Sequence, residues 1–135
     1  MSLHKTILLA FVIMMLGTGL DLYLLSHYED RLQFIPILCI SLLMLMMIVL
    51  FFLRTTLVKN VFKFVLIITA LSGVYGSYLH LIANYEFEIE MQPTANNLDL
   101  FFESLSGALP ALAPLSMVVL ALIGYSYLIL INKKQ

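Results

Sequence analysis

Four apolar runs, each long enough to cross a bilayer, constrain this chain more than any other feature of its sequence. A helix rises 1.5 Å per residue, so about 20 residues cross the roughly 30 Å of hydrocarbon in a membrane. The runs are residues 6–26, 34–53, 64–84 and 109–131. Each is apolar around its whole circumference, as expected where lipid rather than water surrounds a helix. We therefore predict four transmembrane helices.

The composition and the lengths of the connections extend this prediction to a fold class. The chain has 135 residues, of which 62% are hydrophobic and 11% charged. Ordinary soluble domains have about a quarter charged residues, so lipid is expected to cover the excess apolar surface. The connections 27–33 and 54–63 are short, which makes successive helices antiparallel neighbours. The sequence predicts one all-α membrane domain, residues 1–135, folded as an antiparallel four-helix transmembrane bundle.

The charged residues flanking the spans predict the orientation of this bundle. All of the seven Lys and Arg residues except Arg31 lie on one side, and all of the eight Asp and Glu residues except Asp21 lie on the other. An excess of basic residues marks the cytoplasmic side. Both termini are therefore predicted to be cytoplasmic, in what we expect to be a bacterial inner membrane. The basic residues on that side are Lys5, Arg54, Lys59, Lys63, Lys133 and Lys134.

The third connection, residues 85–108, is the only extended one and is predicted to form an outer loop. Residues 85–91 alternate apolar and acidic side chains, a pattern that predicts a half-buried strand. Asn97 is expected to cap a short helix, residues 98–106, lying flat on the outer membrane surface. Pro114 falls inside the fourth span and is expected to kink that helix, because it has no amide hydrogen to donate to the carbonyl of Pro110.

The sequence excludes two classes of function, namely thiol–disulfide oxidoreductases and nucleic-acid-binding proteins. Cys39 is the only cysteine, so the chain forms no intrachain disulfide and no CxxC redox pair, and Cys39 is expected to be a small core or lipid-facing residue. A basic patch of the kind that binds nucleic acid is also absent from the sequence. The predicted partners are therefore the lipid bilayer and other membrane proteins.

Two ionisable residues are predicted to lie at similar depth in the outer half of the membrane. At 1.5 Å per residue, Asp21 lies about 7 Å and His80 about 9 Å outward of the midplane. Charges in hydrocarbon are expensive and are usually retained for a function. Small residues next to them let helices approach closely, so we predict that the first and third helices pack together with Asp21 and His80 facing each other. The residues predicted to form this seam are Gly17, Gly73, Gly76 and Asn84.

We call Asp21 and His80, together with the outer-rim residues His27, Glu29, Asp30 and Glu86, the polar cluster. Three interpretations of this cluster remain open from the sequence. The pair formed by Asp21 and His80 fixes the packing of the bundle, binds a divalent metal ion as cofactor through carboxylate and imidazole ligands, or handles protons or cations as a titratable pair. The ionisable residues of the outer rim would complete a metal site. The predicted metal ligands are Asp21, His27, Glu29, His80 and Glu86.

The functional prediction follows from the lack of a catalytic signature and from the extended outer loop. We expect a non-catalytic binding or accessory subunit that docks on a larger membrane complex, or on a second copy of itself, through residues 85–108. Two alternatives use the polar cluster instead. One is a small cation- or proton-coupled transporter, and the other is a metal-dependent membrane enzyme.

Overall fold

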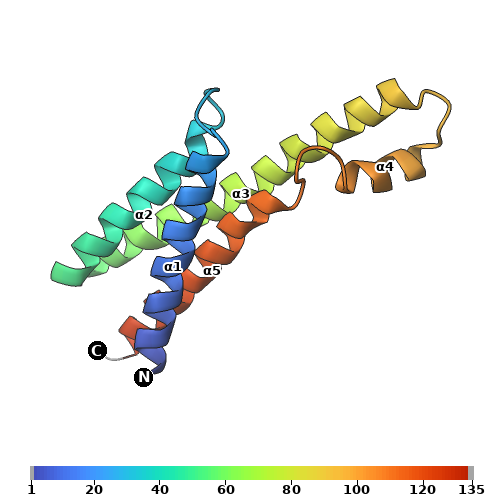
Figure 1. Ribbon diagram of the computed structural model, residues 1–135. Coiled ribbons are helices and arrows are strands. Elements are labelled where there is room, and N and C mark those ends of the chain that lie inside the picture. The colour runs from blue at the N-terminus through green and yellow to red at the C-terminus, as the bar shows by residue number, and fades with distance from the viewer. Residues whose placement is uncertain (1, 134–135) are drawn as a thin grey trace.

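The computed structural model describes residues 2–133, which form helices and the turns between them (Figure 1). Four helices are long and apolar enough to cross a membrane. They are α1 (Leu3–Leu24), α2 (Phe34–Phe52), α3 (Thr56–Met91) and a fourth made of the 3-10 turn η1 (Ala113–Leu115) with α5 (Ser116–Asn132). A short helix, α4 (Asn97–Leu105), lies between the last two. The predicted all-helical chain with four long apolar helices is confirmed.

Each long helix contributes a fully buried side chain to one hydrophobic core. Phe11 of α1, Leu43 of α2, Phe62 of α3 and Leu120 of α5 are all inaccessible to solvent. The rings of Phe11 and Phe62 meet edge to face, with centroids 6.0 Å apart. Helix α3 packs against α2 and α5, and α1 packs mainly against α5. The first turn of α1 and the last turn of α5 lie at the same end of the molecule (Figure 1).

Helix α3 extends beyond the predicted span, residues 64–84, at both ends. It begins after Thr55, whose Oγ1 accepts a hydrogen bond from the amide of Val58 at 3.3 Å. It ends at Met91 because Gln92 precedes Pro93, and a residue before proline is disfavoured in the helical conformation. Its 36 residues make it about 54 Å long at 1.5 Å per residue, against roughly 30 Å of hydrocarbon.

The predicted strand at residues 85–91 is wrong, because these residues continue α3. Adding residues to an existing helix needs no new nucleation step, and glutamate is a good helix former. The tertiary structure adds a second reason. Leu81, Ile82 and Tyr85 recur at helical spacing and line one face of α3 opposite α4. Residues 85–91 do alternate apolar and acidic side chains, but packing of α3 against α4 stabilises a helix instead of a strand.

Helix α4 folds back along the outer part of α3 (Figure 1). It begins one residue earlier than predicted, because Asn96 rather than Asn97 is the cap. The Oδ1 atom of Asn96 accepts hydrogen bonds from the amides of Leu98 and Asp99, both at 2.9 Å. Leu100 and Ser104 are the residues that α4 buries. The flat placement of this helix on a membrane surface stays a prediction.

The predicted kink at Pro114 is also wrong. Pro114 lies in η1, the first turn of the fourth long helix, before α5 begins at Ser116, so it interrupts no α-helix. Proline is tolerated in a first turn because the amides there have no partner within the helix. The carbonyl oxygen of Pro110 accepts a hydrogen bond from the amide of Ala113 at 3.1 Å. The fourth long helix therefore starts at Ala113 instead of residue 109.

Candidate functional site

A cavity of about 590 Å³ lies where the C-terminal end of α1 and the N-terminal end of α2 meet the middle of α3 and the turn that leads into α5. The α1–α2 turn and the outer part of α3 diverge from each other at this level (Figure 1). Most of the residues that line this cavity are apolar, but five titratable side chains lie among them. We call it the polar cavity because of these five. The titratable lining residues are Asp21, His27, Asp30, Tyr75 and His80.

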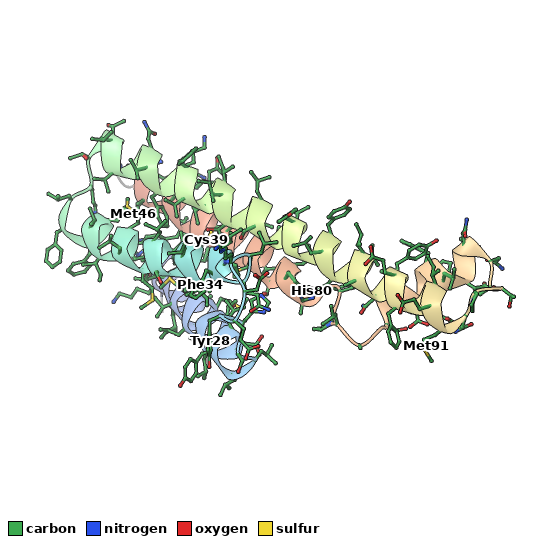
Figure 2. The ribbon with its side chains drawn as sticks, turned by 90° about the horizontal axis from the view of Figure 1, so that it is seen from above. Tyr28, Phe34, Cys39, Met46, His80 and Met91 are labelled. Carbon is green, nitrogen blue, oxygen red and sulfur yellow. The ribbon has the colours of Figure 1, made fainter. Side chains whose placement is uncertain are left out.

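Asp21 from α1 and His80 from α3 both line the polar cavity. The side chain of Asp21 is exposed, whereas that of His80 is half-buried where α3 leaves the bundle (Figure 2). His80 Nδ1 lies 3.2 Å from the carbonyl oxygen of Pro110. A carbonyl oxygen can only accept, so Nδ1 is the donor of this hydrogen bond.

The end of α1 directs His27 toward the same cavity. Ser26 adopts a left-handed conformation with φ of 52°. Its amide donates to the carbonyl of Tyr23 at 3.1 Å, and the amide of His27 donates to that of Leu22 at 2.9 Å. This pair of bonds is a Schellman motif, which closes the helix and reverses the chain. The imidazole of His27 consequently lies with its centroid 6.3 Å from that of His80, at an angle of 64°.

The surroundings of His27 favour its neutral form. Partial burial lowers the pKa of His27 below the ordinary 6.5, and a positive charge on nearby His80 lowers it further. At neutral pH the imidazole of His27 is therefore mostly uncharged. The lining of the polar cavity also contains the carboxyl groups of Asp21 and Asp30.

The structure does not gather the predicted metal ligands into one site. Asp21, His27 and His80 line the polar cavity, but Glu29 and Glu86 are not part of its lining. Both glutamates are exposed, Glu29 in the α1–α2 turn and Glu86 on the outer part of α3. Among residues 2–133, no three His, Cys, Asp or Glu side chains lie close enough together to hold a metal ion. The geometry therefore gives the metal interpretation no support.

Sequence reasoning left Gln33 out of the predicted cluster and Asp30 out of the predicted metal ligands, although both line the polar cavity. Gln33 Oε1 accepts hydrogen bonds from the amides of Glu29 at 2.9 Å and Asp30 at 3.1 Å. These bonds shape the turn that carries His27. The sequence could have indicated both residues, because they belong to the same seven-residue connection as His27 and must therefore lie near it.

The predicted glycine seam has a different partner from the one expected. A Cβ added to Gly73 would lie 2.7 Å from the carbonyl oxygen of Pro114, and one added to Gly76 would lie 2.9 Å from Pro114 Cβ. A Cβ on Gly17 would meet nothing within 4 Å. The glycines of α3 thus allow close approach of η1 and α5, and the prediction that they pack against α1 is corrected.

Asn84 anchors a loop to α3. Its side chain is only 3% exposed. The Nδ2 atom donates to the carbonyl oxygens of Ser104 at 2.8 Å and Leu109 at 2.7 Å, and Oδ1 accepts from the amide of Leu109 at 2.9 Å. Asn84 therefore ties the chain between α4 and η1 to the side of α3.

The outer part of α3, the following turn and α4 together form a projection that we call the outer arm, residues 81–105 (Figures 1 and 2). Met91 lies near its tip (Figure 2). The outer arm contains no Lys, Arg or His, and its acidic residues are Glu86, Glu88, Glu90, Asp99 and Glu103. Large apolar side chains are exposed among these acids. The exposed ones are Phe87, Ile89, Met91, Leu98, Phe101 and Phe102.

Comparison of the chain with protein-family models, curated proteins and solved structures gives no match. Function is therefore inferred from the geometry of the polar cavity and the outer arm.

Proposed function

We propose that this protein is an integral membrane subunit of the bacterial inner membrane, folded as an antiparallel four-span bundle with both termini in the cytoplasm. The length and apolar character of the four helices support it. Large apolar side chains such as Leu16 of α1, Leu45 of α2 and Leu71 of α3 are exposed along the outside of the bundle. In water such a surface would drive association, whereas acyl chains cover it without cost.

The outer arm is the proposed docking surface of this subunit. The observation that carries the proposal is the length of α3, about 54 Å against roughly 30 Å of hydrocarbon, from which we infer that the outer arm extends beyond the hydrocarbon. Its exposed side chains combine aromatic rings such as Phe87 and Phe102 with five carboxylates. Buried aromatic anchors supply most of the free energy of a protein interface, and charges set the partner and its orientation.

The partner is inferred to be a protein with a basic rim around an apolar groove. An anionic lipid surface would repel the carboxylates of the outer arm. A second copy of the chain is disfavoured at this surface, because two outer arms would bring ten carboxylates together. The proposed role is therefore a non-catalytic accessory subunit that presents the outer arm to a membrane-associated partner.

A photocrosslinking experiment in cells tests this proposal. Benzoylphenylalanine replaces Phe102 of the outer arm, or Leu45 of α2 as the matched control. We expect a specific adduct from position 102 alone. The adduct should disappear when Glu86, Glu88 and Glu90 are all changed to Lys, and its partner should carry a basic surface. Equal adducts from both positions, or an adduct that survives the charge reversal, would contradict the proposal.

A cation- or proton-coupled transporter is the second candidate function. The observation that favours it is the polar cavity, in which Asp21, His27 and His80 face one space. A metal-dependent enzyme has no comparable support, since the described residues 2–133 hold no group of three ligands.

A further inference from the structure

The size and lining of the polar cavity suit an organic ligand. Its volume of about 590 Å³ falls within the roughly 300–1,000 Å³ typical of small-molecule sites. Apolar side chains from several elements line it, among them Leu22 of α1, Leu79 of α3 and Met117 of α5. Such a lining favours a ligand with an apolar part, because that part is removed from water on binding.

The charges around the polar cavity select for a cation. The acidic side chains in its lining are Asp21 and Asp30, and neither Lys nor Arg is among the described residues that line it. An anion would therefore be repelled. The ring of Tyr75 also lines the cavity, and an aromatic face attracts an ammonium group.

The arrangement of oxygen and nitrogen acceptors in the cavity favours an ammonium ion over a metal ion. A metal needs three or four ligands converging on one point, and residues 2–133 offer no such group. An ammonium group on a carbon chain accepts a looser arrangement, because its three hydrogens can be satisfied by separate acceptors. The carboxylates of Asp21 and Asp30 and the imidazole of His27 are such acceptors in the lining.

We propose that the polar cavity binds a primary ammonium group carried on an apolar chain, with Asp21 as the main counter-ion. The proposal stands independently of docking by the outer arm. Two sources share this chemistry, namely the headgroup of an amine-bearing phospholipid and a free alkylamine. The lateral position of the cavity between α1 and α3, at the outer end of the bundle, is compatible with both.

The test is binding of hexylammonium to the full-length protein in nanodiscs of phosphatidylglycerol, followed by saturation-transfer NMR. We expect saturable binding of hexylammonium and none of hexanoate. Asp21→Asn removes the charge while keeping the shape, and should weaken binding about tenfold, as expected for one hydrogen bond to a charged group. Glu29→Gln is the matched control, because Glu29 lies in the adjacent turn but outside the cavity lining, and it should leave binding unchanged.

A second variant keeps the proposal testable if Asp21→Asn alters folding. Ala83 lines the cavity from α3 with an exposed side chain, so Ala83→Phe should fill the space and block binding without changing any charge. Equal binding by wild type and both variants, or equal binding of hexanoate, would overturn the proposal. Adding phosphatidylethanolamine to the nanodiscs separates the two sources. Weaker apparent binding of hexylammonium then identifies the lipid headgroup as the occupant, and unchanged binding identifies the free amine.

Discussion

Replacing Asn84 by leucine should detach the loop between α4 and η1 from α3. Leucine has a similar size and shape but makes none of the three hydrogen bonds of the asparagine. The carbonyl oxygens of Ser104 and Leu109 and the amide of Leu109 would each lose their bond to the Asn84 side chain. Because Asn84 is only 3% exposed, water could not easily replace it in the folded loop.

The magnitude follows from the number of bonds and their burial. A typical hydrogen bond contributes about 1 kcal/mol net, so losing three costs about 3 kcal/mol of the free energy that closes this loop. That corresponds to roughly a hundredfold increase in the population of the open loop. The outer arm then loses the contact that holds the C-terminal end of α4 against α3.

Hydrogen exchange at the amide of Leu109 measures this directly. That amide donates to the side chain of Asn84 instead of to a backbone carbonyl, so its protection reports the anchor itself. We expect exchange about a hundredfold faster in Asn84→Leu, because protection scales with the free energy of local opening. Gln92→Leu is the control. It removes an exposed hydrogen bond to Glu103 at 2.7 Å and should leave Leu109 unaffected. Unchanged protection of Leu109 in Asn84→Leu would refute the reasoning.

Two further predictions concern the close approach of α3 to η1 and the pH dependence of the polar cavity. Gly73→Ala places a Cβ 2.7 Å from the carbonyl oxygen of Pro114 and should destabilise the protein by about 1–3 kcal/mol in detergent unfolding. Gly17→Ala, with nothing within 4 Å, should be neutral or slightly stabilising, and equal effects of the two would be contrary evidence. The folded-state pKa of His27 is lowered below 6.5 by burial and by His80, so the unfolded chain binds more protons as the pH falls. The stability present above pH 6.5 should therefore decline as the pH drops through the folded-state pKa, and His27→Gln should flatten this slope in unfolding curves between pH 7.5 and 5.

Hydropathy predicted the long helices well because it depends on local composition. The predicted spans 34–53 and 6–26 differ from α2 and α1 by only a few residues at their ends. The length of α3 was underestimated. The run of high hydropathy stops at the first charged residues, whereas the helical hydrogen bonds continue to Met91. Pro110 was placed inside the fourth helix and Pro114 beyond its first turn, since composition alone does not show where a helix starts.

Depth in the membrane was a useful guide to the candidate site, but only along one axis. Asp21 and His80 were predicted to lie together because their expected depths are similar, and both line the polar cavity. Glu29 and Glu86 belong to the same outer level, yet the first lies outside the cavity lining and the second lies on the outer arm. Depth is encoded by position along a helix, whereas lateral position depends on which helices are neighbours.

The sequence by itself determined that the chain forms four long apolar helices with acidic connections at one end and basic ones at the other. Those properties follow from side-chain hydrophobicity and charge along each segment, and need no knowledge of neighbours. Only the tertiary structure decided that Gly73 and Gly76 meet Pro114, that Asn84 anchors the loop before η1, and that residues 85–91 stay helical against α4. Each of these depends on the approach of segments far apart in the chain, which is set by how whole side-chain surfaces fit together.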